Sequence, residues 1–254
     1  AGRKLGMSVS QTMSVAQHLY EQGLITYMRT DSVNLSKQAM AAAAGYIEAR
    51  YGKEYVQVRA FKTKSAGAQE AHEAIRPTYM ENQKVDGTAQ EKKLYALIWK
   101  RTLASQMADA EVEKTTASIS ISNSSESFIA TGEIIKFDGF LRIYKESRDD
   151  ENEGEDESGL LPPLTVGQTL QSQEILATER FTQRPPRYTE ASLVRKLEEL
   201  GIGRPSTYAP TISTIQQRGY VEKTDRQGED RIYNILTLKD GKVAERRSEE
   251  HTSE

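Results

Sequence analysis

Residues 184–223 read RPPRYTEASLVRKLEELGIGRPSTYAPTISTIQQRGYVEK, a stretch whose pattern predicts two helices joined by a glycine-rich turn. Apolar residues at helical spacing predict a first helix that ends at the glycines of the GIG triplet. Pro205 suits a turn, and Ser206 suits the N-cap of a second helix. That helix is predicted to continue to Arg218 and to end at Gly219.

Two short strands are predicted after these helices. Residues 220–222 and 232–235 have strand-like composition and flank the turn sequence DRQGED. Two helices, a glycine-rich turn and a hairpin make the outline of a winged helix-turn-helix. The turn itself, GIGRPSTY, combines backbone N–H groups with Arg204, Ser206 and Thr207, which are groups that bind a phosphate backbone. A purely structural helix-turn-helix is an equally good interpretation of this pattern.

Residues 112–183 show a period of two, which predicts a β region before the helix-turn-helix. Apolar residues alternate with serines near Ile119, and the pattern continues through residues 134–144 and 168–176. The run ESRDDENEGEDES, residues 146–158, interrupts it and is predicted to be a solvated loop. Its eight acids and one base give it a net charge of −7, so the rest of the chain carries +4 against the total of −3. Basic surfaces for nucleic acid therefore remain possible elsewhere.

Residues 8–110 are predicted to be mostly helical, with one short strand at residues 24–28. Ser36 suits the cap of a helix that ends before Gly52, and residues 91–106 form a further amphipathic helix. The stretch LITYMRTDS, residues 24–32, places Tyr27 and Arg29 two apart, hence on the same side of an extended segment. A tyrosine attacks phosphate only if its phenolate is stabilised, and a guanidinium can do this while it holds the phosphate. A half-buried strand tyrosine beside a surface arginine is the plainer interpretation of the spacing alone.

The stretch QEAHEAIRPT, residues 69–78, is a second candidate for phosphate binding. His72 and Arg76 are four apart, so on a helix they would share one face and could grip a phosphate together. An ordinary helix-end histidine and a surface arginine before Pro77 also explain the pattern. A zinc site is rejected because no second histidine has the required spacing.

Composition excludes several classes of function for the 254 residues. Without cysteine, the chain has no disulfides, no thiolate zinc sites and no cysteine nucleophile. Three histidines are too few for a histidine-rich metal site. No window approaches 18 uncharged apolar residues, which argues against a transmembrane helix and a membrane partner.

Together, LITYMRTDS, AHEAIRPT and RYTEASLVRKLEELGIGRPSTYAPTISTIQQRGYV resemble bacterial type IA DNA topoisomerase I, in this order and from about Gly6 to Tyr220. The resemblance implies an enzyme that cuts one DNA strand through a 5′-phosphotyrosine, passes another strand and reseals the break without ATP. It implies catalytic roles for Tyr27 as nucleophile, Arg29 as positioner of the phosphate, and His72 as a phosphate-binding residue. It implies that Arg204, Ser206 and Thr207 hold the single strand. The further DNA-binding residues expected are Arg76, Arg187, Arg195 and Tyr208.

The resemblance also implies a multidomain α and β fold, a fragment of a toroid. Residues 1–111 would be a helical gate domain that carries Tyr27, residues 112–183 part of an antiparallel β arch, and residues 184–246 a helix-turn-helix base segment. The family's Mg²⁺ ligands lie in an N-terminal Toprim domain, which is expected upstream of this chain. The fragment alone is therefore expected to be inactive. Its expected parent is a monomeric, cytoplasmic, nucleoid-associated enzyme acting on single-stranded and negatively supercoiled DNA.

Two other functions are weighed against this interpretation. A non-catalytic winged-helix DNA-binding protein explains residues 184–237 but leaves LITYMRTDS without a role. A tyrosine recombinase also combines Arg, His and Tyr, but its tyrosine follows the His and Arg, whereas Tyr27 precedes His72. The octapeptide RSEEHTSE, residues 247–254, resembles the translation of a sequencing adapter and is expected to be an artefact rather than native sequence.

Overall fold

A computed structural model of the protein describes residues 1–61, 73–145, 161–182, 185–224 and 228–252. The chain forms two compact units. One contains residues 1–162 and 189–214, and the other contains residues 163–188 and 215–254. The predicted helix-turn-helix segment is thus divided between the units, and the domain boundaries expected from the sequence stay predictions. None of the helices in the described ranges is long and apolar enough to cross a lipid bilayer.

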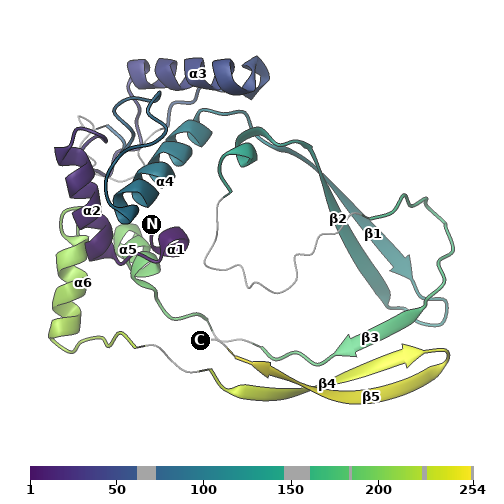
Figure 1. Ribbon diagram of the computed structural model, residues 1–254. Helices are drawn as coiled ribbons and strands as arrows, with labels where there is room; N and C mark the ends of the chain where they lie inside the picture. Colours follow the sequence, from purple (N-terminus) through teal and green to yellow (C-terminus); the bar gives the residue numbers. More distant parts are fainter. Residues whose placement is uncertain (62–72, 146–160, 183–184, 225–227, 253–254) are drawn as a thin grey trace. The chain divides into compact units, whose positions relative to one another are not determined.

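The first unit begins with helices (Figure 1), three of which start after a Ser or Thr whose side chain accepts a hydrogen bond from a backbone amide. Their bounds are α1 Gly2–Leu5, α2 Val9–Glu21, α3 Lys37–Tyr51, the 3₁₀ turn η1 Lys53–Tyr55, and α4 Ala89–Ser105. Ser36 accepts a hydrogen bond from the Ala39 amide at 3.2 Å, so the predicted cap is confirmed, as is the end of α3 before Gly52. Thr88 and Glu91 form a capping box at the start of α4, in which each side chain accepts from the other residue's amide.

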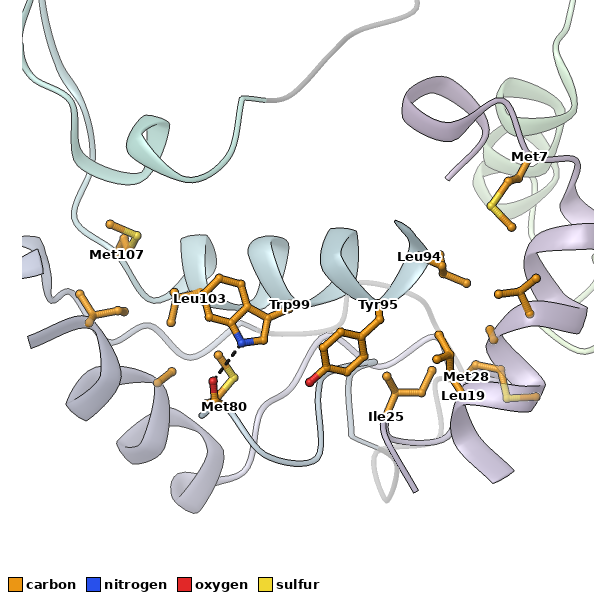
Figure 2. Close-up of a cluster of buried hydrophobic side chains, with 14 of the residues drawn as sticks. Met7, Leu19, Ile25, Met28, Met80, Leu94, Tyr95, Trp99, Leu103 and Met107 are labelled. Atoms are coloured by element: carbon orange, nitrogen blue, oxygen red, sulfur yellow. Dashed lines mark hydrogen bonds between the residues drawn. The ribbon is translucent and has the colours of Figure 1, made fainter. Parts of the chain in front are cut away.

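Helix α4 supplies the centre of the hydrophobic core. Tyr95, Trp99 and Leu103 are four residues apart and therefore share one face, and all three are almost completely buried. Figure 2 shows the Trp99 indole N–H directed at the Met80 carbonyl, 2.9 Å away. Leu19 of α2 packs in the same cluster. This core gives the helical part of the first unit a fixed interior on which a site can be built.

A two-stranded antiparallel ribbon follows α4. Strands β1 Glu111–Ser120 and β2 Ser127–Phe137 pair with Ala117 opposite Ala130, in the region where the sequence predicts strands. The predicted strand at 134–144 is wrong beyond Phe137, because residues 139–142 form the 3₁₀ turn η2. Gly139 has φ +47°, and a Cβ there would lie 2.4 Å from the Asp109 carbonyl oxygen. The chain turns back against residues 108 and 109 at this point, so pairing with β1 cannot continue.

The two helices predicted in residues 184–223 are α5 Glu190–Glu199 and α6 Tyr208–Gln217. Helix α6 begins one residue later than predicted, so Ser206 is not its N-cap. Thr207 stands directly before the helix instead, and its backbone carbonyl accepts the amide of Thr211 at 2.9 Å. The reason is the turn at 204–207, in which the Thr207 amide bonds the Arg204 carbonyl at 2.8 Å.

The predicted hairpin after α6 is wrong, although its second strand, residues 232–235, is confirmed within a longer strand. Residues 220–222 form no strand. The second unit contains a three-stranded antiparallel sheet in the order β3 Glu174–Thr178, β4 Asp230–Lys239, β5 Lys242–His251. Asp240 and Gly241 both have positive φ, at 50° and 71°, which is the geometry of a two-residue type I′ turn.

The Asp-Gly pair at 240–241 is the strongest short hairpin signal, and the sequence interpretation placed the turn at DRQGED instead. Strand β3 also begins later than the predicted strand at 168–176. Residues 247–251, part of the octapeptide expected to be an artefact, lie in β5. The origin of that octapeptide stays a prediction.

Candidate active site

Tyr27 lies exposed between two buried anchors. The chain leaves α2 through Gly23, at φ 71°, and enters the core with Ile25 and Met28, which are both buried. Tyr27 itself is 39% exposed, and its ring meets the ring of Tyr20 edge-on, with centroids 5.2 Å apart. The stretch is thus fixed by its neighbours in sequence while the phenol of Tyr27 can be reached from solvent.

The strand predicted for residues 24–28 is wrong, because only Ile25 pairs, in a single antiparallel bridge with Pro77. Proline has no amide N–H, so a ladder cannot run through it. Two hydrogen bonds flank the bridge, from the Thr26 amide to the Arg76 carbonyl at 2.9 Å and from the Thr78 amide to the Leu24 carbonyl at 3.0 Å. The chain bends at residues 28 and 29, so the argument that Tyr27 and Arg29 share one side of a strand does not apply.

The second motif lies directly against the first. The Thr26 hydroxyl donates to the Ala74 carbonyl at 2.7 Å and accepts from the Arg76 amide at 2.9 Å. On the other side of Tyr27, the Asn34 carbonyl accepts from the Ala74 amide at 2.7 Å. The structure therefore brings AHEAIRPT beside LITYMRTDS, although the described residues 73–78 are not helical. His72 lies outside the described residues.

Arg29 and Arg76 have different surroundings. Arg29 is exposed, and no carboxylate in the described part of the chain forms an ion pair with it. The Arg76 guanidinium instead binds both carboxylate oxygens of Glu73, from Nε at 2.8 Å and from Nη2 at 2.9 Å. Arg29 can thus reach an incoming phosphate, and Arg76 is already held by a carboxylate that the sequence interpretation passed over. Its predicted contact with DNA stays a prediction.

The GIGRPSTY turn presents polar groups to solvent. Gly203 has φ 82°, and a Cβ there would lie 3.1 Å from the Tyr208 ring, so glycine is required. The Thr207 hydroxyl accepts from the Arg204 amide at 2.8 Å, which closes the turn. Arg204 and Ser206 are exposed, and the Arg204 side chain donates to the carbonyl of its neighbour Gly203 at 2.8 Å. This geometry fits the predicted phosphate-binding role, which stays a prediction.

The GIGRPSTY turn of the third motif lies in the same unit as Tyr27. Burial raises the pKa of Tyr208, the negative charges of Glu198 and Asp31 add to this, and Arg204 opposes it. Asp31, which belongs to LITYMRTDS, is among the charges that raise this pKa. The Val9 amide at the start of α2 donates to the Glu190 carboxylate at 2.7 Å, which joins α5 to the helix that precedes LITYMRTDS.

The two remaining predicted DNA ligands are Arg195 and Arg187, and their contact with DNA stays a prediction. Arg195 lies on α5 in the first unit, with its side chain 3.2 Å from the Glu199 carboxylate, one turn along. Arg187 is exposed and belongs to the second unit. Among the described residues, no three His, Asp or Glu side chains are grouped as a metal site would require. The Mg²⁺ that the family resemblance implies therefore has no candidate ligand set in the described part of this chain.

Comparison with known proteins agrees with the three motifs. The sequence profile of the DNA topoisomerase family matches residues 1–230. DNA topoisomerase 1 of Zymomonas mobilis is 48% identical over 226 residues, which are 87% of this chain and 19% of the relative. DNA topoisomerase 1 of Synechococcus elongatus is 52% identical over 228 residues, 87% of this chain and 26% of the relative.

The fold agrees as well. The full-length topoisomerase I of Thermotoga maritima superposes with a TM-score of 0.67 at 36% identity, over 88% of this chain and 37% of that one. The chain thus spans only a part of the relatives it matches. Because the family profile covers most of its length, the chain belongs to the DNA topoisomerase family.

Proposed function

We propose that this chain is the strand-cleaving part of a type IA DNA topoisomerase, with Tyr27 as the nucleophile. The observation that carries the proposal is the setting of Tyr27, an exposed phenol between the buried residues Ile25 and Met28, on a stretch held by the Thr26 hydrogen bonds. A reacting group needs both access and a fixed position. Exposed Arg29 lies two residues further along.

The reaction exchanges one phosphate ester for another. The Tyr27 phenol oxygen attacks a backbone phosphorus and loses its proton, and the bond from phosphorus to the 3′ oxygen breaks. The products are a 5′-phosphotyrosine and a 3′ hydroxyl, which takes up a proton. Reversal of the same step reseals the strand. No nucleotide triphosphate is consumed, because one ester bond replaces another.

Arg29 is the group proposed to assist this attack. A tyrosine phenol is a poor nucleophile at neutral pH, because it titrates near pH 10 in water. A guanidinium presents a planar fork of donors that can hold two phosphate oxygens while it stabilises the phenolate. His72 is proposed to support phosphate binding at the same place, and the exposed Arg204 and Ser206 to hold the strand that approaches it.

The rest of the activity is proposed to need the parts of the relatives that this chain does not span. The chain covers 19% of the Zymomonas relative and 26% of the Synechococcus relative. We propose that a Toprim domain outside the chain holds Mg²⁺ and that the chain is inactive by itself. Single-stranded and negatively supercoiled DNA are the proposed substrates, in the cytoplasm, and the parent enzyme is proposed to be monomeric.

A covalent-trapping assay tests the proposal. The chain is mixed with a Toprim-containing N-terminal piece of the Synechococcus elongatus relative, Mg²⁺ and 3′-labelled single-stranded DNA, then denatured. We expect label on the protein with the wild-type chain and none with Tyr27→Phe, which removes only the nucleophilic oxygen. Tyr20→Phe is the matched control, because its ring packs against Tyr27 and it should retain adduct formation. Adducts that persist in Tyr27→Phe would refute the assignment.

A further inference from the structure

The ion pair of Glu73 and Arg76 lies in the segment that packs beside Tyr27. Arg76 donates four hydrogen bonds from its side chain: two to Glu73, one to the Pro77 carbonyl at 2.8 Å and one to the Thr78 carbonyl at 3.3 Å. A guanidinium has five N–H donors, and the Arg76 side chain is only 16% exposed. A phosphate would have to displace Glu73 to reach this fork. The contacts of Arg76 therefore stabilise the conformation of residues 73–78.

Glu73 extends the same arrangement to helix α3. Its Oε1 atom also accepts from the amide of Ser36 at 2.7 Å, and Ser36 caps α3. Burial alone would raise the pKa of Glu73, but the hydrogen bonds from Arg76 and Ser36 outweigh it and hold the pKa below its ordinary value of 4.5. The carboxylate is thus ionised at neutral pH and available to both donors.

The backbone of the 73–78 segment binds the chain on both sides of Tyr27. Before Tyr27, Thr26 bonds to residues 74 and 76 through its hydroxyl and its amide. After Tyr27, the Asn34 carbonyl accepts from the Ala74 amide at 2.7 Å. The Glu73–Arg76 pair fixes the conformation of this segment, because Arg76 bridges from Glu73 at one end to the carbonyls of residues 77 and 78 at the other.

We propose that the Glu73–Arg76 pair is a positioning device that sets the place of Tyr27 for its attack on phosphate. The pair acts through the 73–78 segment, which holds residues 24–26 and residue 34, the two stretches that flank Tyr27. In this role Arg76 is a positioning residue and no DNA ligand. The inference rests on the proposed function of Tyr27 as the nucleophile.

Two conservative variants test the pair. Arg76→Lys keeps the charge but cannot make the two-pronged contact, and Glu73→Gln keeps the shape but removes the charge. Arg59→Lys is the matched control. The Arg59 side chain also contacts a backbone carbonyl, that of Met107 at 2.6 Å, and a carboxylate, that of Asp109 at 2.8 Å. In the described ranges it makes no hydrogen bond or ion pair with residues 24–34.

The first measurement is amide hydrogen exchange on the 254-residue chain, which needs no catalysis. In Arg76→Lys and Glu73→Gln the amides of Thr26 and Thr78 should exchange about tenfold faster or more, since each tenfold corresponds to about 1.4 kcal/mol of opening free energy. Amides in the middle of α4 should not change. Unchanged exchange at Thr26 and Thr78 would overturn the proposal, and so would a uniform rise that Arg59→Lys reproduces.

The second measurement separates positioning from DNA binding. The affinity of Arg76→Lys and Arg76→Ala for single-stranded DNA is followed as a function of salt. If Arg76 is a positioning residue, both variants should bind single-stranded DNA with the affinity and the salt slope of the wild-type chain. Loss of a phosphate contact would lower the magnitude of the slope by about 0.7 in Arg76→Ala, and that result would overturn the proposal.

The third measurement is the rate of covalent adduct formation at saturating DNA, in the assay with the Toprim-containing piece. A displaced nucleophile should slow this rate by about tenfold to 100-fold in Arg76→Lys, with half-saturation unchanged and Arg59→Lys near wild type. A wild-type rate in Arg76→Lys would contradict the proposal. Failure of the proposed function of Tyr27 can be told apart from failure of this proposal. In the first case adducts would persist in Tyr27→Phe or be absent from the wild-type chain. Amide exchange and DNA binding would still test the role of the Glu73–Arg76 pair.

Discussion

The helical part of the first unit and the β1–β2 ribbon that follows it are held together in different ways. Around α4, Tyr95, Trp99 and Leu103 lose almost all contact with water. On β2, Ile129 is 70% exposed and Ile135 is 56% exposed, so the ribbon depends on its backbone pairing. Tyr27 belongs to the part with an interior, so its exposed side chain lies on a stretch whose neighbours Ile25 and Met28 are buried.

The largest expected effect is on the free energy of unfolding, and it comes from a substitution in the core. Leu103→Ala removes a fully buried side chain and should lower the free energy of unfolding by about 2–5 kcal/mol. Ile129→Ala, on the exposed face of β2, should change it by no more than about 0.5 kcal/mol. Denaturant unfolding monitored by the single tryptophan, Trp99, measures both. Equal effects of the two substitutions would break the comparison.

A smaller effect is expected at two glycines, with opposite signs. Gly241 has φ 71° in the β4–β5 turn, so Gly241→Ala should destabilise that hairpin by about 1–2 kcal/mol. Gly45 lies exposed inside α3 with open space around it, so Gly45→Ala should stabilise the helical part by about 0.5–1 kcal/mol. Amide exchange in β4 and β5 measures the first, and Trp99 fluorescence measures the second. A stabilising Gly241→Ala would show that the type I′ turn is not formed.

The smallest expected effect is a pH dependence of the helical part. The Thr88 amide and hydroxyl hold the pKa of Glu91 below its ordinary value of 4.5, Gln22 and His18 add to this, and burial opposes it. A lowered pKa in the folded state means that this stability is present above pH 4.5 and is lost as the pH falls through the lowered value. Wild-type stability should therefore fall more steeply below pH 4.5 than that of Glu91→Gln. Identical acid profiles, measured by Trp99 fluorescence, would contradict this account.

What could be predicted from the sequence was mostly what neighbouring residues decide. The cap at Ser36, the end of α3 at Gly52, and helices α4 and α5 follow from side chains within a few positions of each helix end. The strand at 24–28 failed because its partner contains Pro77, which lies about 50 residues away. The hairpin after α6 failed because the Asp-Gly pair at 240–241 was passed over.

The candidate site, too, was predicted only in part from the sequence. Tyr27, Arg29 and the GIGRPSTY turn were identified because their motifs resemble a known family. The meeting of LITYMRTDS with AHEAIRPT depends on the Thr26 hydrogen bonds, which no local pattern indicates. Glu73 was missed, although a carboxylate three residues before Arg76 was a signal that the arginine had a partner within the chain.

The proposed nucleophile is identified by mapping the attached nucleotide on the trapped protein. Cleavage after Glu21 separates Tyr20 from Tyr27, whose rings lie 5.2 Å apart, and mass spectrometry of the two peptides then locates the phosphodiester. The account predicts a nucleotide on Tyr27 and none on Tyr20. A nucleotide on Tyr20, or on any other tyrosine of the chain, would contradict it.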